Sequence, residues 1–348
     1  MPLRIPTLVG LWLAAVCAQL SAANIPLNKP TAALLPLQNQ AGHLSAGQAL
    51  HQGVERELVL QLNLASAEDV RNVMRSLRIR STADLSADRL RRVRPALQTD
   101  WLVFITLHDV SLRTIPALTA SAQVYRADTG ELHWSGLVAR SGLNGLPWLG
   151  LGVTYDIPDL AGEVALQLAA DIAGAVSSPA LASSQQAFAD GRKWALVPLA
   201  GLTPKQGTAN AATVTEAVRD VSQQLGLQLV SPNVISEILR RQGVLRWGEV
   251  TRELRVELAS ERAVAAILTG TVEIYEVAGS ATAPQPRVEI SLRLVDAATG
   301  NILWSGAIER SGSHRKGPFG AGRVNSRGEL AQRVTRELLR NLQRSEAF

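Results

Sequence analysis

Residues 127–136 read ADTGELHWSG, and residues 297–306 read AATGNILWSG. The tripeptide Arg-Ser-Gly follows both stretches at the same offset, at positions 140–142 and 310–312. Near the start of each half, Leu-Pro-Leu at 35–37 is matched by Val-Pro-Leu at 197–199, each within an apolar run. These self-matches predict that the chain contains two copies of one structural unit.

The repeated stretch has the pattern of a β-hairpin. Apolar residues occupy alternate positions from 288 to 294, which is the period of a strand with one buried face. Strand character resumes at 302–308, after a turn at 296–300. The last residue of an Asp-x-x-Thr-Gly turn commonly needs a positive φ, which glycine adopts without strain from a Cβ. Gly130 and Gly300 are therefore expected at equivalent turn positions.

Each copy of the hairpin carries a tryptophan four residues after the turn glycine. Trp134 and Trp304 would lie at the same place on the returning strand. Aromatic side chains of this size mostly serve to fill a core. We therefore expect both rings to pack against a helix rather than to stack on a ligand.

Helical periodicity completes the fold class. Four segments of the second half have apolar residues at helical spacing: 211–225, 234–239, 252–263 and 330–342. The predicted order is strand, helix, strand, short helix, helix, three strands and a final helix. This order predicts an α/β protein of two duplicated sandwich domains, each a mixed β-sheet with helices packed against it.

Composition indicates where the two domains begin and end. Residues 179–191 are largely small and polar without periodicity, as in a linker. We therefore assign 32–178 to the first α/β repeat and 192–345 to the second, with 24–31 as an N-terminal segment. The length of 348 residues allows each repeat a core of its own.

The first 23 residues have the pattern of a secretory signal peptide. A basic residue, an apolar run and the small residues Ser21-Ala22-Ala23 follow one another in the expected order. The only cysteine, Cys17, lies inside this segment, so cleavage after Ala23 would leave no thiol for disulfides or metal binding. In the alternative, residues 14–17 form a degenerate lipobox and Cys17 is lipidated. Val16 fits a lipobox poorly, so export to the periplasm as a cleaved protein is the preferred prediction.

Basic residues are concentrated at the C-terminal end. The net charge is +5, and from residue 310 onward nine basic residues face three acidic ones. Five of the nine fall in one predicted loop and its flanks, without an acidic residue among them: Arg310, Arg315, Lys316, Arg323 and Arg327. Such a cluster predicts an anionic partner, either membrane headgroups or an acidic protein. A solvated helix face and loop is the alternative interpretation.

The sequence does not contain the motifs that accompany common catalytic sites. The five histidines lack the spacing of metal ligands, and no nucleophile elbow or phosphate-binding loop is present. Asp128 has no acidic counterpart in the second copy, where Ala298 stands. We therefore expect no catalytic residue, cofactor or metal.

The hairpin and the order of elements around it resemble a known group of proteins. The stretch VDAATGNILWSG at 295–306 is similar to a hallmark of periplasmic domains related to the curli secretion lipoprotein, the penicillin-binding-protein activator lipoproteins and the amino-terminal domain of TolB-like proteins. The resemblance covers 192–345 and, more weakly, 32–178, where Arg126 replaces the first Asp of the turn. It implies a non-enzymatic role in the cell envelope.

The expected function is therefore binding or assembly with partners, as a scaffold, a component of a secretion apparatus or an activator. Envelope proteins or anionic envelope components are the expected partners, nucleic acid is not, and a homo-oligomer is compatible with the resemblance. Outer-membrane association is compatible with it too. A periplasmic hydrolase with an unrecognised active site is the alternative, and it would require Asp128, His108 and His133 to meet in one cleft.

Overall fold

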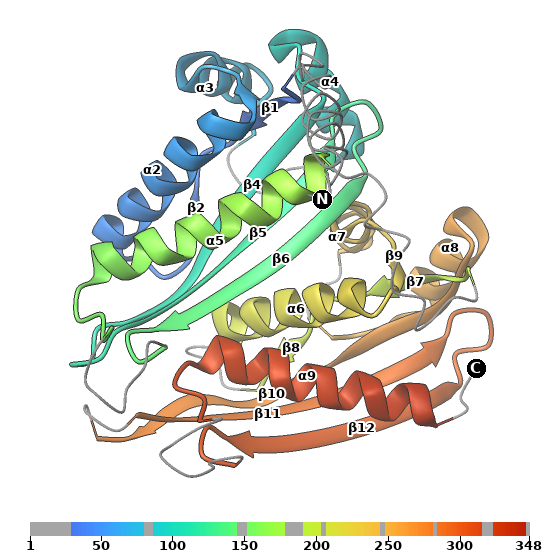
Figure 1. Ribbon diagram of the computed structural model, residues 1–348. Coiled ribbons are helices and arrows are strands. Elements are labelled where there is room, and N and C mark those ends of the chain that lie inside the picture. Colours follow the sequence, from blue (N-terminus) through green and yellow to red (C-terminus); the bar gives the residue numbers. More distant parts are fainter. Residues whose placement is uncertain are drawn as a thin grey trace, which may run out of the picture.

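The computed structural model describes residues 29–79, 86–144, 152–177, 191–202, 207–243, 248–280, 284–314 and 323–345. Within these residues, two mixed β-sheets follow one another along the chain, each with helices packed against it (Figure 1). The predicted fold class is confirmed. The signal segment, Cys17, Arg315, Lys316 and most of the predicted linker lie outside the described residues.

The first half supplies one sheet and its helices. The elements in order are β1 (Thr31–Leu34), β2 (Gln38–Asn39), α2 (Leu44–Gln61), β3 (Asn63–Leu64), α3 (Ala67–Ser76), α4 (Ala87–Leu97), β4 (Trp101–Ser111), β5 (Ala117–Arg126), β6 (Leu132–Ser141) and α5 (Ile157–Ser177). The strand order is β3-β1-β4-β5-β6, with β2 pairing beside β4. Strands β4, β5 and β6 are antiparallel, whereas β1 runs parallel to β4.

The second half has the same order of elements. They are β7 (Lys193–Leu196), β8 (Ala200–Gly201), α6 (Gly207–Gln224), β9 (Gln228–Leu229), α7 (Pro232–Arg241), α8 (Arg252–Arg262), β10 (Val264–Gly279), β11 (Pro284–Asp296), β12 (Ile302–Ser311) and α9 (Arg327–Arg344). The strand order of the second sheet is β9-β7-β10-β11-β12, which corresponds strand by strand to β3-β1-β4-β5-β6 of the first sheet. The helices predicted from periodicity correspond to α6, α7, α8 and α9.

The halves stack so that helices and sheets alternate (Figure 1). Helices α2 and α5 pack on one face of the first sheet around a core that includes Leu50, Val124 and Leu168. On the second sheet, α6 and α9 occupy the corresponding place, and they also touch β6 of the first sheet. Leu137 of β6 belongs to the same hydrophobic cluster as α6 and α9. The helices of the second half are therefore enclosed between the two sheets.

Smaller helices cover the remaining end of each sheet. Helices α3 and α4 enclose a cluster that contains Phe104 and Tyr125, and α7 and α8 enclose one that contains Ile267. Helix α5 is long and apolar enough, by length and composition alone, to cross a membrane. More than half of its apolar stretch, 56%, is buried inside the protein, and its inward side lines the core of the first sheet. We interpret α5 as a core helix.

Polar contacts fix how the halves meet. Gln123 of β5 donates to Glu216 Oε2 of α6 at 2.9 Å, and Arg219 holds the other oxygen of that carboxylate at 2.5 Å. Burial, the largest single influence, raises the pKa of Glu216, but the charge and hydrogen bond of Arg219, with smaller contributions from His108 and Gln123, together outweigh it and the pKa is lowered. The Arg219–Glu216 pair lies within α6, whereas an ion pair between Arg327 of α9 and Asp109 of β4 joins the two halves at 2.5 Å, with both side chains mostly buried. The Gln123–Glu216 hydrogen bond and the Arg327–Asp109 pair require complementary positions on both halves and so favour one docked arrangement.

Two titratable groups are buried in this interface with shifted pKa values. His108 bonds Ser121 Oγ at 2.8 Å and Gln40 Oε1 at 3.1 Å, and burial lowers its pKa to about 4. Asp220 of α6 accepts a hydrogen bond from Gln332 at 2.7 Å, and burial raises its pKa to about 6. Burial disfavours the charged form in both cases, so an acid and a base shift in opposite directions.

Candidate functional site: an arginine-lined groove beside α9

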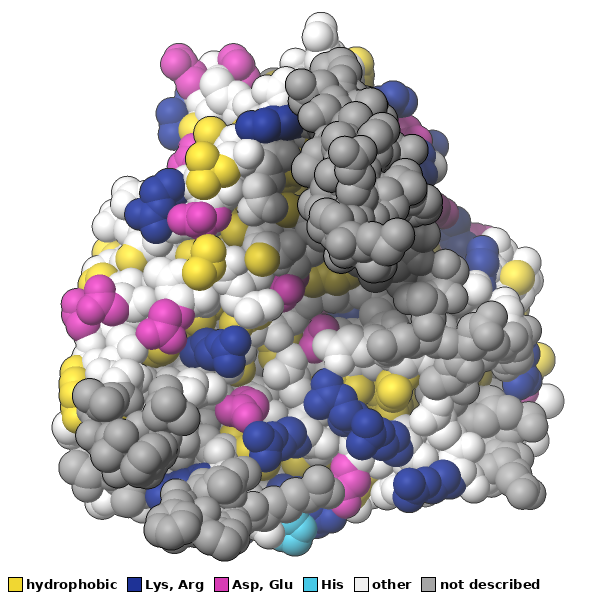
Figure 2. Space-filling model, viewed as in Figure 1, with side chains coloured by type: hydrophobic (Ala, Val, Ile, Leu, Met, Phe, Trp, Pro, Cys, Tyr) yellow, Lys and Arg dark blue, Asp and Glu magenta, His cyan; other side chains and the backbone are white. Residues whose placement is uncertain are grey.

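One side of α9 carries a row of arginines. Arg333, Arg336, Arg340 and Arg344 are spaced three or four residues apart, so they share one side of the helix. The opposite side is apolar and lies in the core of the second half, which leaves the arginines facing outward. Lys and Arg side chains gather on this face of the molecule (Figure 2). The row is therefore a consequence of amphipathic packing of α9.

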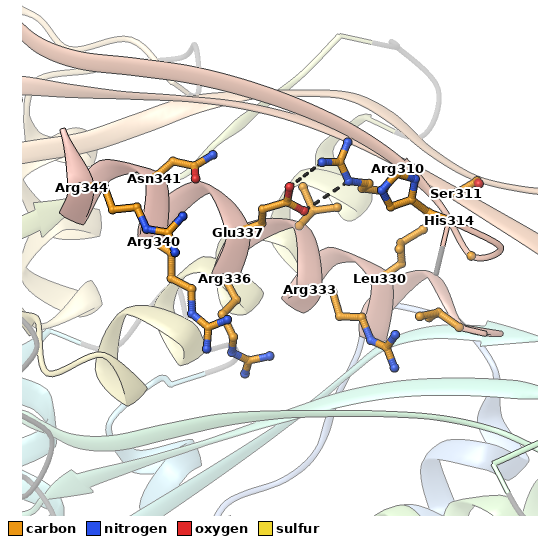
Figure 3. A pocket seen from close by; sticks show the side chains of 13 residues that line it. Arg310, Ser311, His314, Leu330, Arg333, Arg336, Glu337, Arg340, Asn341 and Arg344 are labelled. Atoms are coloured by element: carbon orange, nitrogen blue, oxygen red, sulfur yellow. Dashed lines mark hydrogen bonds and ion pairs between the residues drawn. The ribbon is translucent and has the colours of Figure 1, made fainter. Parts of the chain in front are cut away.

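The arginine row lines a groove of about 440 Å³ between α9 and the end of β12. Arg310 and His314, at and just beyond the end of β12, extend the lining (Figure 3). We call this site the α9 groove. It also includes Glu337, whose carboxylate points toward Arg310.

The positive charge of the groove is only partly neutralised. Arg310 pairs with Glu337, and Arg333 pairs with Glu329 at 2.8 Å. Arg340 and Arg344 are exposed and make no hydrogen bond or ion pair with the described part of the chain.

Arg336 donates to the neutral amide oxygen of Gln224 at 2.7 Å, and its charge also acts on the nearby Asp220, whose pKa it lowers against the larger effect of burial. Five arginines thus face two glutamates, and the groove is suited to carboxylate or phosphate groups.

The structure separates the predicted basic cluster into residues with different surroundings. Arg310 lines the α9 groove. Arg323 donates to the carbonyl of Pro284 at 2.9 Å, and Arg327 is held by Asp109 and lies over the Tyr275 ring. A partner-binding role for the predicted five therefore stays a prediction, and Arg327 in addition joins the two halves.

Sequence reasoning missed the four α9 arginines as a set. It treated 330–342 only as an amphipathic helix and counted its basic residues toward the total charge. The signal was nevertheless present, because the spacing of Arg333, Arg336, Arg340 and Arg344 places them on one side of any helix. What periodicity could not show is that β12 ends beside this row.

The two hairpin turns have closely similar geometry. Gly130 and Gly300 have φ angles of 71° and 82°, in the region that glycine favours. Asp296 accepts hydrogen bonds from the backbone and hydroxyl of Thr299, and these bonds lower its pKa. In the first half, where Arg126 stands at the first position of the turn, Asp128 accepts the equivalent backbone bond from Thr129 at 2.8 Å.

The two hairpin tryptophans also have similar surroundings. Trp134 packs against the cluster beneath α2 and α5, and Trp304 packs against the cluster beneath α6 and α9. Each ring lies over the glycine two residues further along its strand, Gly136 or Gly306, where a Cβ would collide with it. The Trp-Ser-Gly sequence thus provides both the ring and the space that the ring occupies.

The groups that an enzymatic interpretation would bring together have separate partners. His108 is enclosed by Gln40 and Ser121, His133 bonds the carbonyl of Ala175, and Asp128 pairs with Arg126 in the hairpin turn. Among the described residues, no group of three His, Cys, Asp or Glu side chains is placed to hold a metal ion.

Comparison with known proteins gives matches in structure only. No protein-family model and no curated relative matches the sequence. The structure is similar to lipoprotein GNA1162 from Neisseria meningitidis (TM-score 0.32, 20% identity), covering 44% of this chain and 99% of that one. It is similar to the PelC dodecamer from Paraburkholderia phytofirmans (TM-score 0.29, 18% identity), covering 44% of this chain and 88% of that one.

A third match is the LpoB C-terminal domain from Salmonella enterica (TM-score 0.25, 16% identity), which covers 38% of this chain and 93% of that one. These matches agree with the group of envelope proteins that the hairpin motif resembles. Each spans less than half of this chain and most of the matching chain, a share comparable to one of the two halves.

Proposed function

We propose that this chain is a non-catalytic protein of the cell envelope that binds an anionic partner in the α9 groove. The observation that carries the proposal is the pair of exposed arginines, Arg340 and Arg344, that lack a counter-ion among the described residues while their neighbours are partly compensated. Like charges held close together repel one another, and a ligand of opposite sign removes that repulsion.

The first half supports this role by holding the second half in place. The first half bonds α6 through Gln123 and bonds the N-terminal part of α9 through Asp109 and the Leu137 carbonyl, so the helix that bears the arginines is anchored at that end. A rigid helix presents its side chains with little loss of conformational freedom on binding. We propose the periplasm as the place of action, in line with the predicted signal peptide.

A pair of matched double variants tests the proposal. Arg340→Gln/Arg344→Gln removes two exposed charges that are four residues apart on α9. Arg71→Gln/Arg75→Gln does the same on α3, where both side chains are exposed and make no hydrogen bond or ion pair with the described part of the chain. Neither change should lower the melting temperature much, because exposed charges contribute little to folding.

Both variants and the wild type would be used as bait for envelope fractions at low and at high salt, about 50 mM and about 500 mM. We expect partners of the wild type at low salt to be lost at high salt, because exposed charges are screened. We expect the same partners to be lost from the α9 variant and retained by the α3 variant. Equal retention by both variants would contradict a role for the α9 groove.

A further inference from the structure

Strand β6 is the edge of the first sheet, and three of its backbone groups bond side chains of the second half. The Ser135 N–H donates to Gln223 Oε1 at 2.8 Å, and the Leu137 carbonyl accepts from Gln332 Nε2 at 2.8 Å. At the start of the strand, the Leu132 N–H donates to Ser231 Oγ at 3.0 Å. An edge strand would otherwise expose unpaired backbone donors and acceptors.

Strand β12 is the corresponding edge of the second sheet, and it pairs only with β11 among the described strands. Its register on β11 matches that of β6 on β5, so Ser305 and Ala307 correspond to Ser135 and Leu137. Their outward backbone groups have no hydrogen-bond partner within the described ranges. Among the described residues, the edge that the second half covers in the first sheet therefore has no counterpart covering β12 in the second sheet. Figure 1 shows β6 facing α6 and α9, and β12 as the last strand of its sheet.

A second copy of this chain is poorly suited to close that edge in the same manner. At the offset that relates the two hairpins, the position of Gln332 is taken by Gly162 in the first half, which has no side chain to donate. The neighbouring residue on α5 is Glu163, whose carboxylate accepts a hydrogen bond from Thr154 at 2.7 Å. The second copy therefore lacks the side chain that closes the edge of β6 in the first half.

The open edge and the α9 groove run side by side. Helix α9 packs on the core-facing side of β11 and β12, and Gly306 of β12 lies against Leu338 of α9. A strand added to β12 would present alternate side chains toward the groove, about 7 Å apart. The row from Arg333 to Arg344 spans about 16 Å along the helix, which matches three such side chains.

We infer that β12 and the α9 groove together bind an extended acidic segment of a partner protein. The segment adds as a strand to β12 through its main chain, and its acidic side chains at alternate positions pair with Arg333, Arg340 and Arg344. This inference rests on the proposed function and adds to it the class of partner and the mode of binding, known in other systems as strand addition.

The test uses the mature protein and an eight-residue fluorescent peptide with Glu at alternate positions and Val or Thr between them. Two further peptides carry N-methyl groups on every second residue, one on each of the two alternate sets. An N-methyl group removes a donor, so only the set whose N–H groups face β12 should abolish pairing. We expect one methylated peptide to bind at least about tenfold more weakly and the other to bind within about twofold of the parent, since several main-chain bonds are lost only in the first.

Hydrogen exchange locates the bound peptide, with slower exchange expected for the amides of Ser305 and Ala307. Arg340→Gln/Arg344→Gln should weaken binding by about fivefold, as expected for two exposed ion pairs, whereas Arg71→Gln/Arg75→Gln should not change it. Binding that needs the arginines but is equally tolerant of both methylated peptides would overturn strand addition and leave the proposed function standing.

Two other results would contradict the acidic partner segment itself, and one of them would also contradict the proposed function. If the peptide fails to bind at low salt while phosphatidylglycerol vesicles bind in an arginine-dependent manner, the partner is a membrane surface and the inferred acidic segment is wrong. If neither probe binds the wild-type protein, the proposed function fails together with the inference.

Discussion

Stability should depend on pH through two buried groups that act in opposite directions. The pKa of His108 is lowered to about 4 by burial, so the unfolded chain binds its proton near pH 6.5 before the folded protein does. The stabilising contribution of neutral His108 is therefore present above about pH 6.5 and is lost as the pH falls toward about 4. Between about pH 8 and about pH 5 the loss amounts to about 2 kcal/mol.

Asp220 acts in the opposite sense. Burial raises its pKa to about 6, so the folded protein holds a proton that the unfolded chain has already released. Its contribution is present at low pH and is lost as the pH rises through about 6. From about pH 8 to about pH 5 it therefore stabilises the fold by about 1 kcal/mol, which partly masks the effect of His108 in the wild-type protein.

Single variants separate the two effects. His108→Gln keeps a side chain that can bond Ser121 and Gln40 but does not titrate. Asp220→Asn likewise keeps a side chain that can accept the hydrogen bond from Gln332 but does not titrate. We would measure the free energy of unfolding in urea at both pH values for each protein. Relative to wild type, the change on acidification should be about 2 kcal/mol more favourable for His108→Gln and about 1 kcal/mol less favourable for Asp220→Asn. An identical change in wild type and His108→Gln would refute the assigned pKa and its cause.

Three other predictions concern the core, the junction and export. Trp304→Ala should lower the free energy of unfolding by about 3 kcal/mol, at the lower end for a large aromatic because the ring is only partly buried, and urea denaturation measures this. Arg327→Met should cost about 2 kcal/mol because it leaves Asp109 without its partner, and a double variant with Asp109→Asn should recover part of that loss. Intact-mass analysis of the exported protein should show a chain that begins at Asn24, whereas a lipid-modified species that begins at Cys17 would contradict the predicted cleavage.

The fold class was predictable because its local signals were strong. The hairpin at 288–308 combines strict alternation with a turn whose glycine takes a positive φ, and both features are visible in the sequence. The helices were found for the same reason, although α6 and α9 begin a few residues earlier than their periodicity indicated, at Gly207 and Arg327. Helix ends depend on capping and tertiary contacts, such as the bond from the Glu329 N–H to Ser326, which periodicity does not report.

The site was less predictable because charge alone does not reveal the partner of a charge. Arg310 and Arg327 look alike in the sequence, yet one faces Glu337 in an open groove and the other faces Asp109 between the two halves. The contact from Arg327 to Asp109 joins residues far apart in the chain, so only the packed arrangement could show it. Spacing along one helix was informative for Arg340 and Arg344 because that relation is local.

A difference between the two sheets explains why helices of the second half pack over β5 of the first sheet, whereas the equivalent part of β11 in the second sheet stays partly exposed. In β5 both faces are buried, and its second face carries the small polar residues Thr119 and Ser121 that allow helices of the second half to approach closely. At the equivalent positions β11 carries Glu289 and Ser291, and its second face is partly exposed. Charged residues there tolerate water and resist a third layer of helices. This face of the second sheet is therefore less suited to a layer of helices than the corresponding face of β5, whereas among the described strands β12 pairs only with β11. The inferred acidic segment accordingly adds to the edge of β12, beside the arginines of α9, and not to the face of the sheet.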